Sequence, residues 1–151
     1  MLARSSGEMC FPLSEDHKPD NAGEKARIEA AGGFVEENRV NGSLNLSRSL
    51  GDFEYKSSES LPYTQQMVTC VPEVRQVTRG PQDQFVILAC DGIWDCLTSE
   101  DCVIQTRDAI DKLSADAPLT TPIEEMFDRI IAKDILSSAG VGTDNMTCII
   151  V

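Results

Sequence analysis

The sequence predicts an α+β fold, because patterns of β-hairpins and of separate helices both occur along its 151 residues. Residues 85–90 are a run of uncharged, mostly apolar side chains, which is typical of a strand buried on both faces. A second strand is predicted for residues 146–151. The segments before and between these strands carry the caps and the spacing of helices and hairpins. The length is sufficient for one domain with a hydrophobic core.

The first predicted elements are a hairpin and a helix. The pattern of residues 1–13 indicates a β-hairpin that turns at residues 5–8. Asp20 or Asn21 is placed to cap a helix, which we expect to end at Gly32-Gly33 because glycine commonly follows a helix C-terminus.

The middle of the chain is predicted to hold short strands and a long loop. Side chains alternate over residues 34–46, and Asn41-Gly42 is a strong hairpin signal within them. Residues 47–66 are polar with little periodicity, which indicates a long surface loop of the kind that is often functional. Two short strands are predicted for residues 67–71 and 73–78.

Two helices are predicted between the strand at residues 85–90 and the strand at residues 146–151. One begins near Thr98 or Ser99, with Asp101 placed for a capping box. The other begins at Thr121-Pro122, a cap followed by proline at the first helical position. The apolar stripes expected to be buried are Val103, Ile110 and Leu113 in the first helix, and Ile123, Phe127, Ile130, Ile131 and Ile135 in the second.

Composition and charge exclude several classes of partner. A net charge of −12 leaves no basic stripe to meet the phosphates of a nucleic acid or an anionic membrane surface. No apolar stretch approaches the roughly 20 residues of a membrane span. The six cysteines contain no Cys-x-x-Cys pair and no signal peptide is evident, which favours reduced thiols in a cytoplasmic or nuclear compartment.

Acidic residues stand at the ends of both strands. Asp91 directly follows the first strand, and Asp144 lies just before the second. If the strands are antiparallel neighbours, both carboxylates fall on one edge of the sheet with Asp95 beside them, a plausible seat for a hard divalent cation that keeps several waters. The alternative is that Asp-Gly and Asp-Asn are here an ordinary turn and cap without a ligand.

Six segments, in order, bear on family membership. They are Leu13–Pro19, Arg27–Gly33, Arg39–Leu44, Ser47–Lys56, Phe-Val-Ile-Leu-Ala-Cys-Asp-Gly-Ile-Trp-Asp at 85–95 and Gly-Thr-Asp-Asn-Met-Thr-Cys-Ile-Ile-Val at 142–151. Together they closely resemble the signature blocks of the metal-dependent protein phosphatases of type 2C, over the C-terminal portion of that catalytic domain. The resemblance implies a four-layered α/β/β/α sandwich with antiparallel sheets. It also implies that residues 16–66 correspond to the family's flap.

The resemblance further implies a reaction and a set of site residues. The family hydrolyses phosphoserine and phosphothreonine in phosphorylated protein substrates, with water activated between two Mg²⁺ or Mn²⁺ ions. By motif, Asp91 and Asp144 would ligate one metal, and Asp91 with Asp95 would help to hold a weaker third. Arg39 in the flap, and then Arg48, are the candidates for contacting substrate. The alternative for both arginines is a solvated surface position.

The sequence also departs from the family. The upstream Asp-Gly-His-Gly-Gly block, the phosphate-binding Arg and the Glu of the second metal do not occur in it. We therefore expect a serine/threonine phosphatase whose 151-residue piece is inactive alone, with a non-catalytic interaction module or pseudophosphatase fragment as the alternative. His17 is expected to be structural and Cys90 to be an inert buried thiol. Strand edges and apolar faces at residues 86–88 and 149–151 are expected to be exposed and to favour a homodimer.

Overall fold

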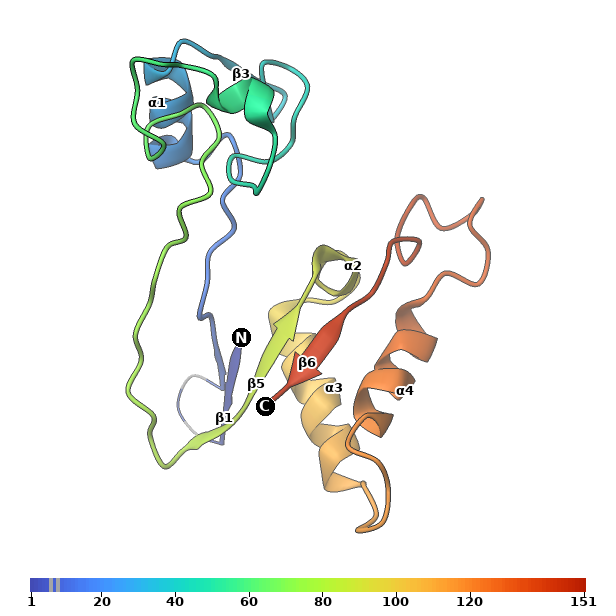
Figure 1. The fold of residues 1–151 in the computed structure, drawn as a ribbon. Coiled ribbons are helices and arrows are strands. Elements are labelled where there is room, and N and C mark those ends of the chain that lie inside the picture. Colours follow the sequence, from blue (N-terminus) through green and yellow to red (C-terminus); the bar gives the residue numbers. More distant parts are fainter. Residues whose placement is uncertain (6, 8) are drawn as a thin grey trace. The chain divides into compact units, whose positions relative to one another are not determined.

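The computed structural model describes residues 1–5, 7 and 9–151, and these form two compact units. The first unit consists of residues 1–13 and 77–151, and the second of residues 14–76. Each unit combines helix with antiparallel β-structure, so the chain has the predicted α+β fold (Figure 1). No helix in the described part of the chain is both long enough and apolar enough to cross a membrane.

The first unit is built on a four-stranded antiparallel sheet in the order β2-β1-β5-β6. Its strands are β1 (Leu2–Arg4), β2 (Cys10–Phe11), β5 (Asp83–Ala89) and β6 (Cys148–Ile150). The predicted hairpin of residues 1–13 is present, since β1 pairs with β2. Its turn at 5–8 includes residues 6 and 8, which lie outside the described residues. β5 and β6 are antiparallel neighbours as expected, and Ile87 pairs with Ile150.

One face of this sheet packs against helices and forms the core. Phe85 and Ile87 of β5 are buried there with Cys102, Val103 and Met126 of the helices. The prediction that β5 is buried on both faces is wrong, because the helices of this unit cover one face only. On the other face Leu88 is 52% exposed.

Two long helices and one short helix belong to the first unit: α2 (Asp91–Trp94), α3 (Ser99–Asp111) and α4 (Thr121–Ile130). Thr98 caps α3, and its hydroxyl oxygen accepts a hydrogen bond from the Asp101 N–H at 3.1 Å. α4 begins one residue earlier than predicted: Thr121 is already helical, Thr120 takes the cap position without a side-chain hydrogen bond, and Pro122 lies in the first turn.

The predicted apolar stripes of these helices are correct only in part. Val103 is buried with Cys102 and Thr106, but Ile110 is 36% exposed in the last turn of α3. Ile131 and Ile135 are exposed because α4 ends at Ile130, before either residue.

The second unit holds α1 (Ala22–Ala30), the hairpin of β3 (Val35–Glu36) and β4 (Arg39–Val40), and a 3₁₀ turn η1 (Phe53–Lys56). The tight turn of the hairpin lies at Glu37-Asn38, whose φ angles are 49° and 56°, and not at Asn41-Gly42 as predicted. Asn41-Gly42 forms a second turn that brings Leu44 back to a single bridge with Val40.

The strands predicted for residues 67–71 and 73–78 are absent from the described structure. Only one isolated bridge forms, between Thr69 and Arg48. Residues 67–71 are held by packing, since Val68 is fully buried in a small core with Ile28 and Val40, whereas residues 73–78 are exposed.

Candidate metal centre

Asp91 and Asp144 lie at the same end of the β5–β6 ladder. Asp91 follows β5 directly and begins α2, while Asp144 stands four residues before β6. The ladder continues past its last strand pair, because the Cys90 N–H donates to the Thr147 carbonyl at 3.1 Å. The expected antiparallel pairing therefore brings the two acidic turns to one edge of the sheet.

The two carboxylates are exposed and are held in the same way. The Gly92 N–H donates to Oδ1 of Asp91 at 3.1 Å, and the Asn145 N–H donates to Oδ1 of Asp144 at 2.7 Å. Within the described residues the second oxygen of each carboxylate accepts no hydrogen bond. Each acidic turn thus presents one oriented and unshared oxygen.

Asp95 belongs to the same short helix. It follows α2 as its C-cap, and its N–H donates to the Asp91 carbonyl at 2.8 Å. The indole N–H of Trp94 donates to the Ala89 carbonyl at 2.8 Å and ties α2 to the end of β5. Asp95 is exposed, one helical turn after Asp91.

Cys90 lies between the two acidic turns rather than inside a fully buried strand. It is half-buried, its thiol donates to the Asn145 carbonyl, and its sulfur accepts from the Thr147 N–H, with both distances 3.2 Å. The expected burial is wrong because β5 ends at Ala89. These hydrogen bonds give the sulfur a structural part in joining the two turns.

The donor set fits part of a coordination sphere for a hard cation. Carboxylate oxygens are the ligands that Mg²⁺ and Mn²⁺ prefer, and Mg²⁺ retains several waters when proteins supply one or two carboxylates. In the described part of the chain, no three His, Cys, Asp or Glu side chains are grouped so that they could hold a metal between them. The described structure therefore does not gather Asp91, Asp95 and Asp144 into one group of ligands, and a cation at the two acidic turns would need further ligands.

The two arginines predicted to face substrate have different surroundings. Arg39 is exposed, and its Nη1 donates to the Ser43 carbonyl at 2.7 Å. Arg48 is held within the second unit, where Nε and Nη2 donate to Glu24 and Nη1 donates to the Val71 carbonyl at 3.1 Å. Of these two arginines, Arg48 is held by contacts within its own unit, whereas Nε and Nη2 of Arg39 make no hydrogen bond to the described residues.

Glu24 is the residue that the sequence argument missed. Its carboxylate, 7% exposed, accepts hydrogen bonds from Arg27, Arg48 and the Ser47 hydroxyl. Burial alone raises the pKa of this carboxyl. The hydrogen bonds from Arg48, Ser47 and Arg27 outweigh that effect and lower the pKa to about 2. No spacing rule could find the cluster, because Ser47 and Arg48 lie 23 and 24 positions away.

His17 also serves the second unit. Its carbonyl accepts from the Ser47 hydroxyl at 2.6 Å, and its Nε2 lies 3.2 Å from Oε2 of Glu73. Both contacts agree with the structural role expected for this histidine.

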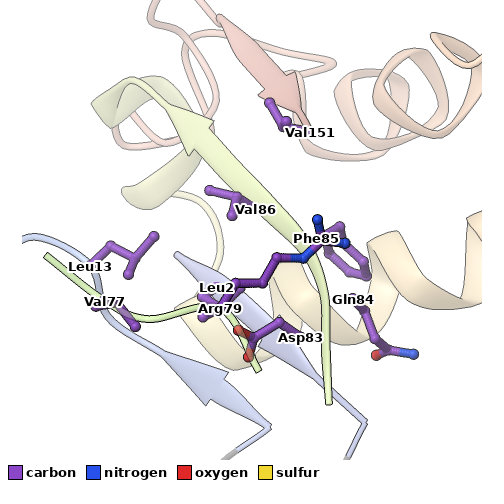
Figure 2. Close-up of a pocket in the computed structure, with 9 residues that line it drawn as sticks. All are labelled: Leu2, Leu13, Val77, Arg79, Asp83, Gln84, Phe85, Val86 and Val151. Atoms are coloured by element: carbon purple, nitrogen blue, oxygen red, sulfur yellow. The ribbon is translucent and has the colours of Figure 1, made fainter. Parts of the chain in front are cut away.

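A pocket of about 350 Å³ lies elsewhere in the first unit (Figure 2). It opens on the sheet face that the helices leave uncovered, beside the first half of β5. Its lining is Leu2, Leu13, Val77, Arg79, Asp83, Gln84, Phe85, Val86 and Val151. None of the predicted site residues lines this pocket, so the pocket does not support the proposed metal site.

The chain thus has an α+β fold with an antiparallel sheet, and two acidic turns lie at one end of the paired strands β5 and β6. The protein phosphatase 2C family matches residues 1–135 of the chain. The chain therefore belongs to the protein phosphatase 2C family.

Individual relatives agree with this assignment. The chain is 53% identical to protein phosphatase 2C homolog 2 of Schizosaccharomyces pombe over 140 residues, which is 93% of this chain and 37% of that protein. It is 47% identical to probable protein phosphatase 2C 60 of Arabidopsis thaliana, over 97% of this chain and 40% of that protein. The chain thus spans about two fifths of the length of these relatives.

Solved structures share the fold. A phosphatase from a pathogenic strain of Toxoplasma gondii superposes with a TM-score of 0.73 and 30% identity, over 93% of this chain and 40% of that one. A serine-threonine phosphatase 2C from Toxoplasma gondii gives a TM-score of 0.71 with 25% identity, over 99% of this chain and 49% of that one.

Proposed function

We propose that this chain supplies one side of the metal centre of a protein serine/threonine phosphatase that acts on phosphorylated proteins. Family membership supports the phosphatase reaction. The observation that supports the metal assignment is the β5–β6 register, because the turns that carry Asp91 and Asp144 lie at the same end of these paired strands.

Asp91 and Asp144 would hold one Mg²⁺ or Mn²⁺ ion of a pair, and Asp95 would help Asp91 to hold a weaker third. When bound, such ions lower the pKa of a coordinated water and neutralise charge on phosphoryl oxygens. One backbone N–H group holds Oδ1 of each carboxylate, which leaves Oδ2 of each available for a cation. The exposed guanidinium of Arg39 is the proposed contact for a substrate phosphate.

The 151 residues alone are proposed to be catalytically inactive. They supply the carboxylates of one metal, whereas a two-metal reaction needs further ligands and a phosphate-binding group. Each missing charge-stabilising group typically costs on the order of 10²–10³ in rate. A cytoplasmic or nuclear compartment stays a prediction from the cysteine pattern.

The test is hydrolysis of a phosphothreonine peptide with added Mn²⁺, by the 151-residue chain and by any longer product of its gene. We expect turnover from the longer product only, and its loss in Asp91→Asn. Turnover by the 151 residues alone would contradict their inactivity. A longer product that binds phosphoproteins without hydrolysing them would favour the non-catalytic interaction module instead.

A further inference from the structure

The two acidic turns touch each other through the residue that follows each aspartate. Gly92 follows Asp91, Asn145 follows Asp144, and Gly92 is buried against the Asn145 backbone. A Cβ added at Gly92 would lie 2.2 Å from the Asn145 carbonyl oxygen and 3.1 Å from its carbon. Contacts below 3.0 Å force the backbone to shift, so this position accepts glycine alone without moving one turn away from the other.

The same two residues orient the carboxylates. The N–H of Gly92 and the N–H of Asn145 are the donors that fix Oδ1 of Asp91 and Oδ1 of Asp144. A displacement between Gly92 and Asn145 is therefore passed directly to both carboxylates, with no intervening side chain.

A second glycine holds the Asp144 turn from its other side. Gly142, with φ +73°, accepts a hydrogen bond from the Ala132 N–H at 2.8 Å just beyond the end of α4. A Cβ at Gly142 would lie 2.2 Å from the Ile130 carbonyl oxygen. The loop before Asp144 is thus seated on the C-terminal end of α4, two residues from the carboxylate.

From these contacts we infer that Gly92 and Gly142 are positioning residues for the metal site, because together they clamp the Asp144 turn between α2 and the end of α4. This inference rests on the proposed function, since it assumes that Asp91 and Asp144 bind a cation together. The clamp sets the separation of the two carboxylates, and the metal affinity follows from that separation. Supporting residues of this kind typically change metal affinity by roughly 10–100-fold when they are altered.

Isothermal titration calorimetry measures the binding of Mn²⁺, with no other ligand present, to the 151-residue chain and to each variant. Urea unfolding measures the stability of the same proteins. Gly92→Ala and Gly142→Ala should each weaken Mn²⁺ binding by roughly 10–100-fold. Gly23→Ala is the matched glycine control, because a Cβ there meets nothing within 4 Å. Val103→Ala is the stability control: it removes buried volume from the core and should lower stability without changing Mn²⁺ affinity.

The outcomes separate the inference from the proposed function. If the unaltered chain binds Mn²⁺ and both glycine variants bind it equally well, the clamp is wrong and the metal site stands. If affinity falls in Val103→Ala as much as in Gly92→Ala, the effect is general destabilisation and the clamp is again wrong. If the unaltered chain binds no Mn²⁺, the inference that its two clamped turns form a cation site is wrong, whereas the proposed phosphatase function, which draws on further ligands, is judged by the hydrolysis test.

A measurement on the unaltered chain covers the case in which the glycine variants do not fold. Amide hydrogen exchange at Gly92 and Asn145 is followed while Mg²⁺ is titrated. Both amides should become protected with one shared midpoint, because both hold carboxylates of a single site. Two separate midpoints, or protection of one amide only, would overturn the inference.

Discussion

Glu24 and Arg48 form an ion pair across 24 positions of sequence, with Nη2 of Arg48 lying 2.5 Å from Oε1 of Glu24. Arg27 shares the same carboxylate from within α1, 2.7 Å from Oε2. Because Arg48 also donates to the Val71 carbonyl, the pair connects the first turn of α1 to two distant segments of the second unit. The packing of that unit therefore depends on one buried acid.

Replacing Glu24 should destabilise the second unit strongly. In Glu24→Gln the guanidinium groups of Arg27 and Arg48 lose their counter-charge, and breaking a buried pair in this way costs about 3 kcal/mol or more. Urea unfolding followed by the amide signals of Ile28 and Ser47 measures the loss. Glu29→Gln is the matched control, because Glu29 is exposed in the same helix. Equal stability of the two variants would show that the pair contributes little.

The same carboxylate should make the second unit sensitive to acid. Its pKa lies at about 2 in the folded state, against an ordinary value of 4.5. A lowered folded pKa gives stability that is complete above about pH 4.5 and is lost as the pH falls toward 2. The shift corresponds to roughly 2–4 kcal/mol. The free energy of unfolding, measured between pH 6 and about pH 2.5, should fall more steeply with decreasing pH in the unaltered chain than in Glu24→Gln. Equal pH dependence in the two proteins would show that protonation of Glu24 is not the cause of the acid sensitivity.

The carboxylates of the metal edge should matter for activity and not for folding. In a longer phosphatase product of this gene, Asp91→Asn or Asp144→Asn should lower Mn²⁺-dependent turnover by on the order of 10²–10³. Both side chains are exposed, so circular dichroism and the melting temperature should change little. Asp95→Asn should mainly raise the Mn²⁺ concentration required. Near-normal turnover of either of the first two variants at saturating Mn²⁺ would remove that residue from the site.

The cap of α3 should contribute measurably to stability. Thr98→Ala removes the hydroxyl that accepts from the Asp101 N–H and should cost about 1 kcal/mol. Thr120→Ala is a close control, because Thr120 precedes α4 in the same way but its side chain makes no capping hydrogen bond. Chemical denaturation of both variants checks the difference, and an equal loss would mean that the cap hydrogen bond is not the cause.

The uncovered sheet face should promote association of the 151-residue chain. Leu88 and Ile149 are register neighbours on that face, exposed by 52% and 54%. Exposed apolar neighbours of this kind favour self-association, so we expect light scattering to report a dimer or larger species. Leu88→Lys combined with Ile149→Lys should restore the monomer. A monomeric unaltered chain that binds no apolar dye would contradict the prediction.

The structure corrects the expectation that residues 86–88 and 149–151 are all exposed. Ile87 is fully buried, and Ile150 is half-buried on the helix side of the sheet. Side chains alternate along a strand, so only every second residue of the two apolar runs faces away from the helices.

The sequence by itself determined the elements whose signals are local. Apolar runs, caps and proline placed β5, β6 and the starts of α3 and α4, and the antiparallel pairing then predicted that Asp91 and Asp144 share an edge. Four features were decided only by the tertiary structure. β5 is buried on one face because helices of its unit cover one face, residues 67–71 pack without forming strands, and Glu24 collects partners from distant segments. The contact between Gly92 and Asn145 belongs with them, because a close approach of two backbones across 53 positions leaves no periodic trace in the sequence. Local signals follow from backbone preferences within a few residues, whereas burial and ion pairing depend on which segments meet in space.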